Sequence, residues 1–163
     1  MKKQNNTISD SLCLTFLTFF GTGYSPFAPG TVGSLATIPL LYCFYLLNLP
    51  LWIFLTITLI LTIVSCFIAE HIQQKKEVHD PGWIVIDEVL GMMVTWSFCY
   101  MQFDFYTITA VFLIFRVFDI FKIWPATYFD KKVTHGSGTI LDDIISGVFA
   151  GIVILIGKYF LDS

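Results

Sequence analysis

Long apolar runs alternate along the chain with short polar segments that carry most of the charge. Five runs are long enough to form helices that cross or enter a membrane, at residues 31–47, 51–69, 84–101, 105–121 and 140–161. A membrane-spanning helix needs roughly 20 apolar residues, because each residue advances it by about 1.5 Å. The second run meets this requirement most cleanly, since it contains no charged residue. The pattern predicts an all-α integral membrane protein with about five transmembrane or membrane-embedded helices.

A shorter apolar stretch precedes these runs. Residues 12–20 are too few to span a bilayer, and the segment GTGYSPFAPG follows at once, with no small-residue cleavage site of a signal peptide. We interpret this stretch as an interfacial or re-entrant helix. The length of 163 residues suits one domain. We therefore expect a single domain over residues 1–163, with an interfacial segment at 1–20 and a helical catalytic core at 21–163.

The distribution of lysines predicts the orientation of the chain. When the five runs are threaded in order, one side carries Lys2, Lys3, Lys75, Lys76, Lys122, Lys131 and Lys132, and the other side carries Lys158. Cytoplasmic loops of membrane proteins are enriched in Lys and Arg. We therefore expect a multi-pass protein whose N-terminus and longer loops face the cytoplasm.

The composition excludes several classes of protein. Apolar residues make up 56% of the chain and charged residues 13%, against about 45–50% and about 25% in soluble domains. Disordered chains and basic nucleic-acid-binding domains are excluded by these values. The four cysteines form no CxxC pair, which argues against a zinc site. A soluble all-α protein with buried helices is the alternative, but it would need more polar surface than this chain offers.

Charged residues interrupt three of the apolar runs, always at the predicted cytoplasmic end. They are Asp87 and Glu88, Arg116 and Asp119, and Asp142 and Asp143. A carboxylate near the centre of a span costs at least about 2.5 kcal/mol and usually has a function. Adjacent acids on a helix point about 100° apart, so one of each pair is expected to face a shared centre. The alternative is that these acids only stabilise helix N-termini through the helix dipole.

The shared depth of these residues suggests a metal and phosphate site. Clustered carboxylates repel one another unless a hard divalent cation joins them, and oxygen ligands without a His/Cys cluster suit Mg²⁺. The candidate ligands are Asp87, Glu88, Asp142 and Asp143. Arg116, Asp119 and Lys122 recur at a spacing of three residues, so neighbours in this series share a helix face that can hold an anion. An ion pair within one helix is the alternative for Arg116 and Asp119.

Glycines are concentrated in two stretches on the same predicted side. Residues 21–33 read GTGYSPFAPGTVG, and a later loop reads HGSG with Gly136 and Gly138 as candidate phosphate-binding residues. Glycine lets backbone amides approach a phosphate, although no Walker motif is present and ordinary turns are the alternative. Gly147 and Gly151 form a small-residue face that favours close helix packing.

Two further residues are candidates for the site. Asp80 lies in a DPG turn just before the acidic run, from which it could reach the site. His135 could transfer a proton or cap a loop.

Four segments together resemble a known family: GTGYSPFAPGTVGSL, VHDPGWIVIDEVLGM, FRVFDIFKIWPATYFD and GTILDDIISGVFAG. In this order and spacing, over about residues 20–155, they resemble the phosphatidylglycerophosphatase A family of bacteria. This chain has HGSG where the family pattern has GGxG. The resemblance implies a Mg²⁺-dependent phosphoric monoester hydrolase of the bacterial inner membrane. It would convert phosphatidylglycerophosphate to phosphatidylglycerol and inorganic phosphate, a step of phospholipid biosynthesis.

The resemblance also assigns residues to the expected site. The family's motif residues fall on Asp80, Asp87, Glu88, Arg116, Asp119, Lys122, Asp142 and Asp143. We expect Arg116 and Lys122 to bind the phosphate. The nucleophile is either a water activated by the metal or a carboxylate, which would form a phospho-aspartate at Asp119 or Asp142.

Other functions remain as alternatives at this point. A small ion or proton transporter also carries intramembrane acids, but it usually holds them near the midplane and shows internal repeats. A CDP-alcohol phosphotransferase has a different signature, and a structural membrane subunit leaves the charged residues unexplained. The expected partners are the lipid substrate and the membrane, with no nucleic acid and no evident protein partner. Homo-oligomerisation is left open.

Overall fold

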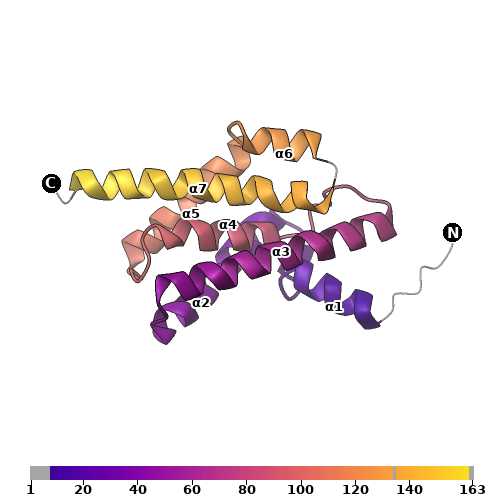
Figure 1. The fold of residues 1–163 in the computed structure, drawn as a ribbon, viewed down its shortest axis with the longest axis horizontal. Coiled ribbons are helices and arrows are strands. Elements are labelled where there is room, and N and C mark those ends of the chain that lie inside the picture. Colours follow the sequence, from indigo (N-terminus) through magenta and orange to yellow (C-terminus); the bar gives the residue numbers. More distant parts are fainter. Residues whose placement is uncertain (1–7, 134, 162–163) are drawn as a thin grey trace.

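The computed structural model describes residues 8–133 and 135–161, and every regular element in this part of the chain is helical. The elements are α1 (Ile8–Leu17), the 3₁₀ turn η1 (Thr22–Tyr24), α2 (Pro29–Leu47), α3 (Leu51–Lys76), α4 (Ile86–Ser97), α5 (Phe105–Phe121), α6 (Ala126–Lys132) and α7 (Gly136–Leu161). They pack as an elongated bundle in which α3 and α7 are the longest helices (Figure 1). The all-α prediction is confirmed.

Three of the helices are long and apolar enough to cross a membrane, namely α2, α3 and α7. The runs at 84–101 and 105–121, which we expected to be further spans, form the shorter helices α4 and α5, of 12 and 17 residues. At a rise of 1.5 Å per residue, α4 is about 18 Å long, against about 30 Å of bilayer hydrocarbon. The length of α4 therefore suits a helix held within the bundle.

The short helix α4 forms the centre of the packed core. It lies between α3 and α7 in Figure 1 and also contacts α2 and α5. Leu90, Met92, Met93 and Trp96 of α4 are fully buried. The Trp96 ring meets Phe54 of α3 edge to face at 5.3 Å between centroids, and its indole N–H donates to the Gln102 carbonyl at 3.0 Å. The buried position of α4 fixes its first turn, which carries two of the candidate acids.

Glycines allow α4 and α7 to approach closely. A Cβ atom on Gly147 of α7 would lie 2.5 Å from the carbonyl oxygen of Gly91 in α4. The Thr95 hydroxyl donates to the carbonyls of both glycines, at 2.9 Å to Gly91 and 3.2 Å to Gly147. This agrees with the small-residue face expected from the sequence. The crossing holds the N-terminal halves of the two helices side by side.

The start of α5 is set by a side-chain cap. Asp104 accepts hydrogen bonds from the amides of Tyr106 and Thr107 at 3.0 Å each, and from the Thr107 hydroxyl at 2.6 Å. These bonds, above all that from the Thr107 hydroxyl, lower the pKa of the Asp104 carboxyl. Because α5 begins here, Arg116 and Asp119 fall in its last turns, as expected.

The N-terminal helix α1 packs against the same core. Leu14 and Leu17 belong to the buried cluster, and the Leu17 carbonyl accepts a hydrogen bond from the Val85 amide at 3.0 Å. Asp10 is buried and lies 2.6 Å from Lys75 of α3. The segment that we predicted to lie at the interface thus contacts the end of α3 and the residue just before α4.

Candidate active site

Three carboxylates meet where α4 and α7 begin. Asp87 and Glu88 lie in the first turn of α4, and Asp143 lies in the second turn of α7, because α7 starts at Gly136 rather than near residue 140. One oxygen from each carboxylate lies within 4.8 Å of the others, and Asp87 and Asp143 are buried. The later position in α7 weakens the alternative that Asp143 only stabilises a helix N-terminus.

This acidic triad of Asp87, Glu88 and Asp143 fits a divalent metal ion. The Glu88 Oε2 atom is buried and has no hydrogen-bond partner among the described residues. Three close carboxylates in an apolar bundle repel one another, and a cation that they share removes this repulsion. The donor set consists of oxygens, which suits a hard cation such as Mg²⁺. The residues present therefore support the expected type of cofactor.

The two cations at the site are each paired with an acid outside the triad. Arg116 forms an ion pair with Asp119 one turn further along α5, and its Nη1 donates to the Ser34 hydroxyl of α2 at 3.5 Å. Lys122, just after α5, forms an ion pair with Asp142 of α7. Asp142, which the sequence placed among the metal ligands, therefore contacts a lysine.

Arg116 retains a donor that these contacts do not use. Its Nε atom is buried and has no hydrogen-bond partner among the described residues. A guanidinium fork in a buried setting suits the oxygens of a phosphate. The position next to the triad makes Arg116 the best placed anion-binding group of the described chain.

The start of α2 forms a further wall of the site. A Cβ atom on Gly30 would lie 2.1 Å from the Glu88 Oε1 atom and 3.3 Å from the Arg116 Nη1 atom. A larger residue at this position would therefore displace the Glu88 carboxylate from its place in the triad. The sequence indicated the stretch 21–33 in general terms but did not single out Gly30 or Ser34. The feature of the sequence that could have indicated Gly30 is the proline-glycine pair just before an apolar run.

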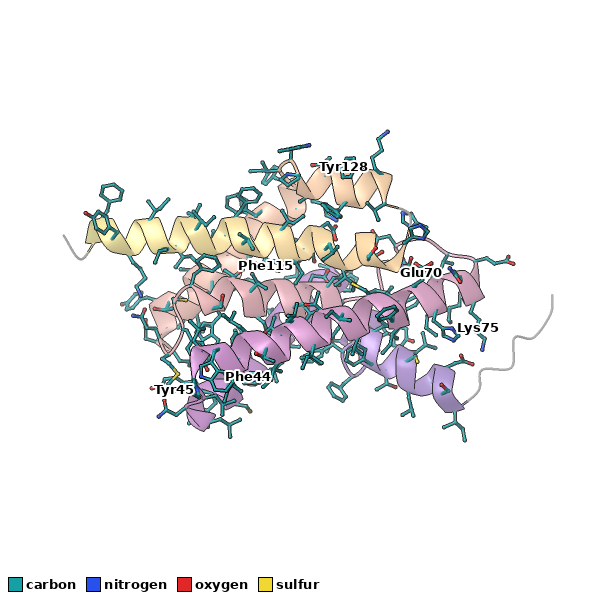
Figure 2. All side chains as sticks on the ribbon, viewed as in Figure 1. Phe44, Tyr45, Glu70, Lys75, Phe115 and Tyr128 are labelled. Carbon is teal, nitrogen blue, oxygen red and sulfur yellow. The ribbon has the colours of Figure 1, made fainter. Side chains whose placement is uncertain are left out.

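The HGSG loop lies against α3. The Gly136 amide donates to the carboxylate of Glu70, which Figure 2 labels on α3 near the start of α7. A Cβ atom on Gly136 would lie 2.2 Å from the Glu70 backbone nitrogen, and one on Gly138 would lie 2.0 Å from the Val133 carbonyl oxygen. Both glycines are thus required sterically, and their binding of phosphate stays a prediction.

The candidates His135 and Asp80 lie on the surface. The side chain of His135 is exposed, and its Nδ1 atom lies 3.4 Å from Glu70 Oε1. Asp80 is exposed in the loop between α3 and α4, and no hydrogen bond or ion pair within residues 8–133 and 135–161 involves its side chain. The structure brings neither residue to the acidic triad by a contact, so their roles stay predictions.

Comparison with known proteins gives matches over most of this chain. The sequence profile of the family described as Phosphatidylglycerophosphatase A matches residues 15–158. A protein named Phosphatidylglycerophosphatase A from Escherichia coli is 39% identical over 142 residues, covering 86% of this chain and 80% of the relative. A protein of the same name from Haemophilus influenzae is 35% identical over 142 residues, covering 87% and 86%.

A third relative carries a different name. A Bacteroides thetaiotaomicron protein named as a candidate phosphatidylinositol-3-phosphatase is 31% identical over 147 residues, covering 87% of this chain and 91% of the relative. No solved structure gives a significant match. With a matching profile over most of its length and relatives above 30% identity, this chain belongs to the phosphatidylglycerophosphatase A family.

Proposed function

We propose that this chain hydrolyses phosphatidylglycerophosphate to phosphatidylglycerol and inorganic phosphate. The observation that carries the proposal is the acidic triad, which lies beside the Arg116 guanidinium in an otherwise apolar bundle. Family membership and the names of the Escherichia coli and Haemophilus influenzae relatives support the same substrate. A lipid phosphate monoester carries its charge at the membrane surface, where such a site would meet it.

We further propose a topology with the site at the cytoplasmic face of a bacterial inner membrane. In this arrangement α2, α3 and α7 span the bilayer, α4 and α5 are embedded among them, and α1 lies at the interface. Lys75 and Lys76 at the end of α3 support this orientation, since that end of α3 packs against the start of α7 through Glu70. Lys158 lies near the other end of α7 and donates to Gln102. The chain would act as one domain over residues 1–163.

Mg²⁺ is the cofactor that we propose, held by Asp87, Glu88 and Asp143. When bound, it would offset the charge of the triad and polarise a phosphoryl oxygen. Asp142 stays a predicted ligand, although its contact with Lys122 supports a role in orienting that lysine.

The remaining residues would bind and position the phosphate. Arg116 and Lys122 donate to its oxygens, and their partners Asp119 and Asp142 hold the two cations in place before the substrate arrives. Cations that are fixed in a water-poor site stabilise the charge of a phosphoryl transition state with little reorganisation.

We propose water as the nucleophile. Asp119 and Asp142 each hold a cation, which lowers the electron density that a carboxylate needs to attack phosphorus. The water oxygen bonds to phosphorus, the bond from phosphorus to the glycerol oxygen breaks, and that oxygen takes up a proton. The proton that the water loses passes to a carboxylate of the site.

The test is phosphate release from phosphatidylglycerophosphate in detergent micelles, with Mg²⁺ or with EDTA. We expect release by the wild type with Mg²⁺, and its loss in Asp87→Asn and Asp142→Asn proteins that remain helical by circular dichroism. Glu77→Gln, which changes an exposed acid after α3, is the matched control and should retain activity. No release from well-folded wild type would overturn the proposal.

A further inference from the structure

An apolar groove of about 390 Å³ lies between α2 and α5. Its walls include Leu35 and Ile38 from α2 and Phe103, Ile108, Thr109 and Phe112 from α5 and the turn before it. Ile108 is buried, whereas Leu35 is 47% exposed at the rim. The groove therefore opens to the outside of the bundle, which is the side that would face lipid.

One end of the groove lies one helical turn from Arg116 of the candidate active site. Leu35 follows Ser34, whose hydroxyl accepts the hydrogen bond from Arg116. On α5, Ile108, Phe112 and Arg116 recur every four residues and so share one face of the helix. A group bound to the Arg116 guanidinium would thus lie one helical turn from the apolar wall that Phe112 forms.

At its other end the groove is lined by Phe103 and Phe105, with Asp104 between them. Phe103 stacks on Tyr45 at 5.7 Å between centroids and lies 5.1 Å from the Tyr42 ring. Between Phe105 and Arg116, α5 advances by about 16 Å, which is roughly half of the hydrocarbon thickness of a bilayer. The part of α5 that lines the groove, Phe105 to Phe112, accounts for about 10 Å of this advance, so the groove and the site together span about the depth of a single membrane leaflet.

From this geometry we infer that the groove between α2 and α5 binds an acyl chain of the lipid whose phosphate lies at Arg116. The inference rests on the proposed function and adds to it the part of the chain that recognises the lipid tail. An apolar groove that begins beside a phosphate-binding cation matches a molecule with a phosphate head and a hydrocarbon tail. Contacts along the groove would favour substrates with long acyl chains.

A second apolar groove provides an internal comparison. It has about 370 Å³, lies between α5 and α7, and is lined by residues that include Ala110, Ile114 and Val153. One turn closer to the site, Phe118 of α5 stacks on Phe149 of α7, with 6.1 Å between centroids. Along α7, Phe149 lies between Val153 of the second groove and Asp143 of the triad. The two grooves are similar in size, but only the first is lined by α5 residues on the helix face that carries Arg116.

The experiment compares a tryptophan in each groove. Leu35→Trp fills the first groove and Val153→Trp the second, at side chains that are 47% and 42% exposed. The measured quantity is the ratio of kcat/KM for long-chain phosphatidylglycerophosphate to kcat/KM for its dihexanoyl form, with Mg²⁺ and fixed detergent. We expect wild type to prefer the long-chain lipid, because an apolar pocket distinguishes substrates that differ in their number of methylene groups. Leu35→Trp should lower the ratio about tenfold. Val153→Trp should leave the ratio within about twofold of wild type.

Each other outcome overturns the inference. An unchanged ratio in Leu35→Trp, or an equal fall in Val153→Trp, would exclude a specific acyl site. A second copy of this chain in the groove would instead make Leu35→Trp reduce the mass of the detergent-solubilised particle without changing the ratio. Thr109→Phe fills the groove from the opposite wall if Leu35→Trp does not fold. Absence of activity on both lipids in wild type would refute the proposed function itself, and the groove with it.

Discussion

Replacing Gly147 with alanine should force α4 and α7 apart and disrupt the acidic triad. The new Cβ would lie 2.5 Å from the Gly91 carbonyl oxygen and 3.1 Å from the Gly91 carbonyl carbon, whereas ordinary contact begins at 3.4 Å. Both are backbone atoms of a buried helix, so neither can rotate away. The helices must therefore separate by nearly 1 Å, the difference between the distance of 2.5 Å and ordinary contact.

Stability and activity should both fall as a consequence. Overpacking of a core costs about 1–3 kcal/mol, and the contact of 3.2 Å between the Thr95 hydroxyl and the Gly147 carbonyl would be strained as well. Asp143 lies one turn before Gly147, so it would move away from Asp87 and Glu88. A displacement of about 1 Å at reacting groups can lower the rate about 100-fold.

The assay is kcat for phosphate release with Mg²⁺, together with the melting temperature in detergent. Gly147→Ala should lower kcat about 100-fold and lower Tm by roughly 2–4 °C for each kcal/mol lost. Gly157→Ala is the matched control in the same helix, because its Cβ would meet no atom within 4 Å. A Gly147→Ala protein with the kcat of wild type would refute the reasoning that the close crossing sets the geometry of the triad.

Three further changes test the other parts of the site. Arg116→Lys should lower kcat/KM roughly 10- to 100-fold in the phosphate-release assay, because lysine lacks the planar fork that binds two oxygens, and wild-type kinetics would exclude Arg116 from phosphate binding. Gln73→Leu removes the hydrogen bond of 2.8 Å to the buried Thr139 hydroxyl and should lower the free energy of unfolding by about 1–3 kcal/mol. Adding Thr139→Val should restore part of this loss, because the hydroxyl that lost its partner is then removed as well. Purely additive effects of the two changes in urea unfolding would contradict this coupling. EDTA should abolish phosphate release while circular dichroism stays helical, and Mg²⁺ should restore it; activity in EDTA would show that no divalent cation is needed.

The helical segments followed from the sequence because of the physics of the bilayer. Backbone groups in hydrocarbon must satisfy their own hydrogen bonds, so an apolar run in a membrane protein forms a helix. The run at 105–121 became α5 with the same bounds, and the run at 51–69 became the first part of α3. The run at 84–101 was too long, since α4 covers only Ile86–Ser97. The turn at DPGW and the hydrogen bond of Val85 to α1 place the start of this helix at Ile86. Hydropathy alone could not predict these contacts.

The resemblance to the family and the grouping of charges at one end were also available from the sequence. Charged residues in apolar runs are costly, so their shared position already indicated a common site. The sequence could not say which acid of each adjacent pair faces the centre, because neighbours on a helix point about 100° apart.

The packing of the helices determined which acid of each pair faces the centre. The crossing at Gly91 and Gly147 brings Asp143 to the first turn of α4, while Asp142 points to Lys122 instead. The same packing brings Gly30 against Glu88, a contact between residues far apart in the chain. Local sequence therefore determined which segments are helices and at which end their charges lie. Only the tertiary structure determined which charges meet, because that depends on how closely and at what rotation separate helices pack.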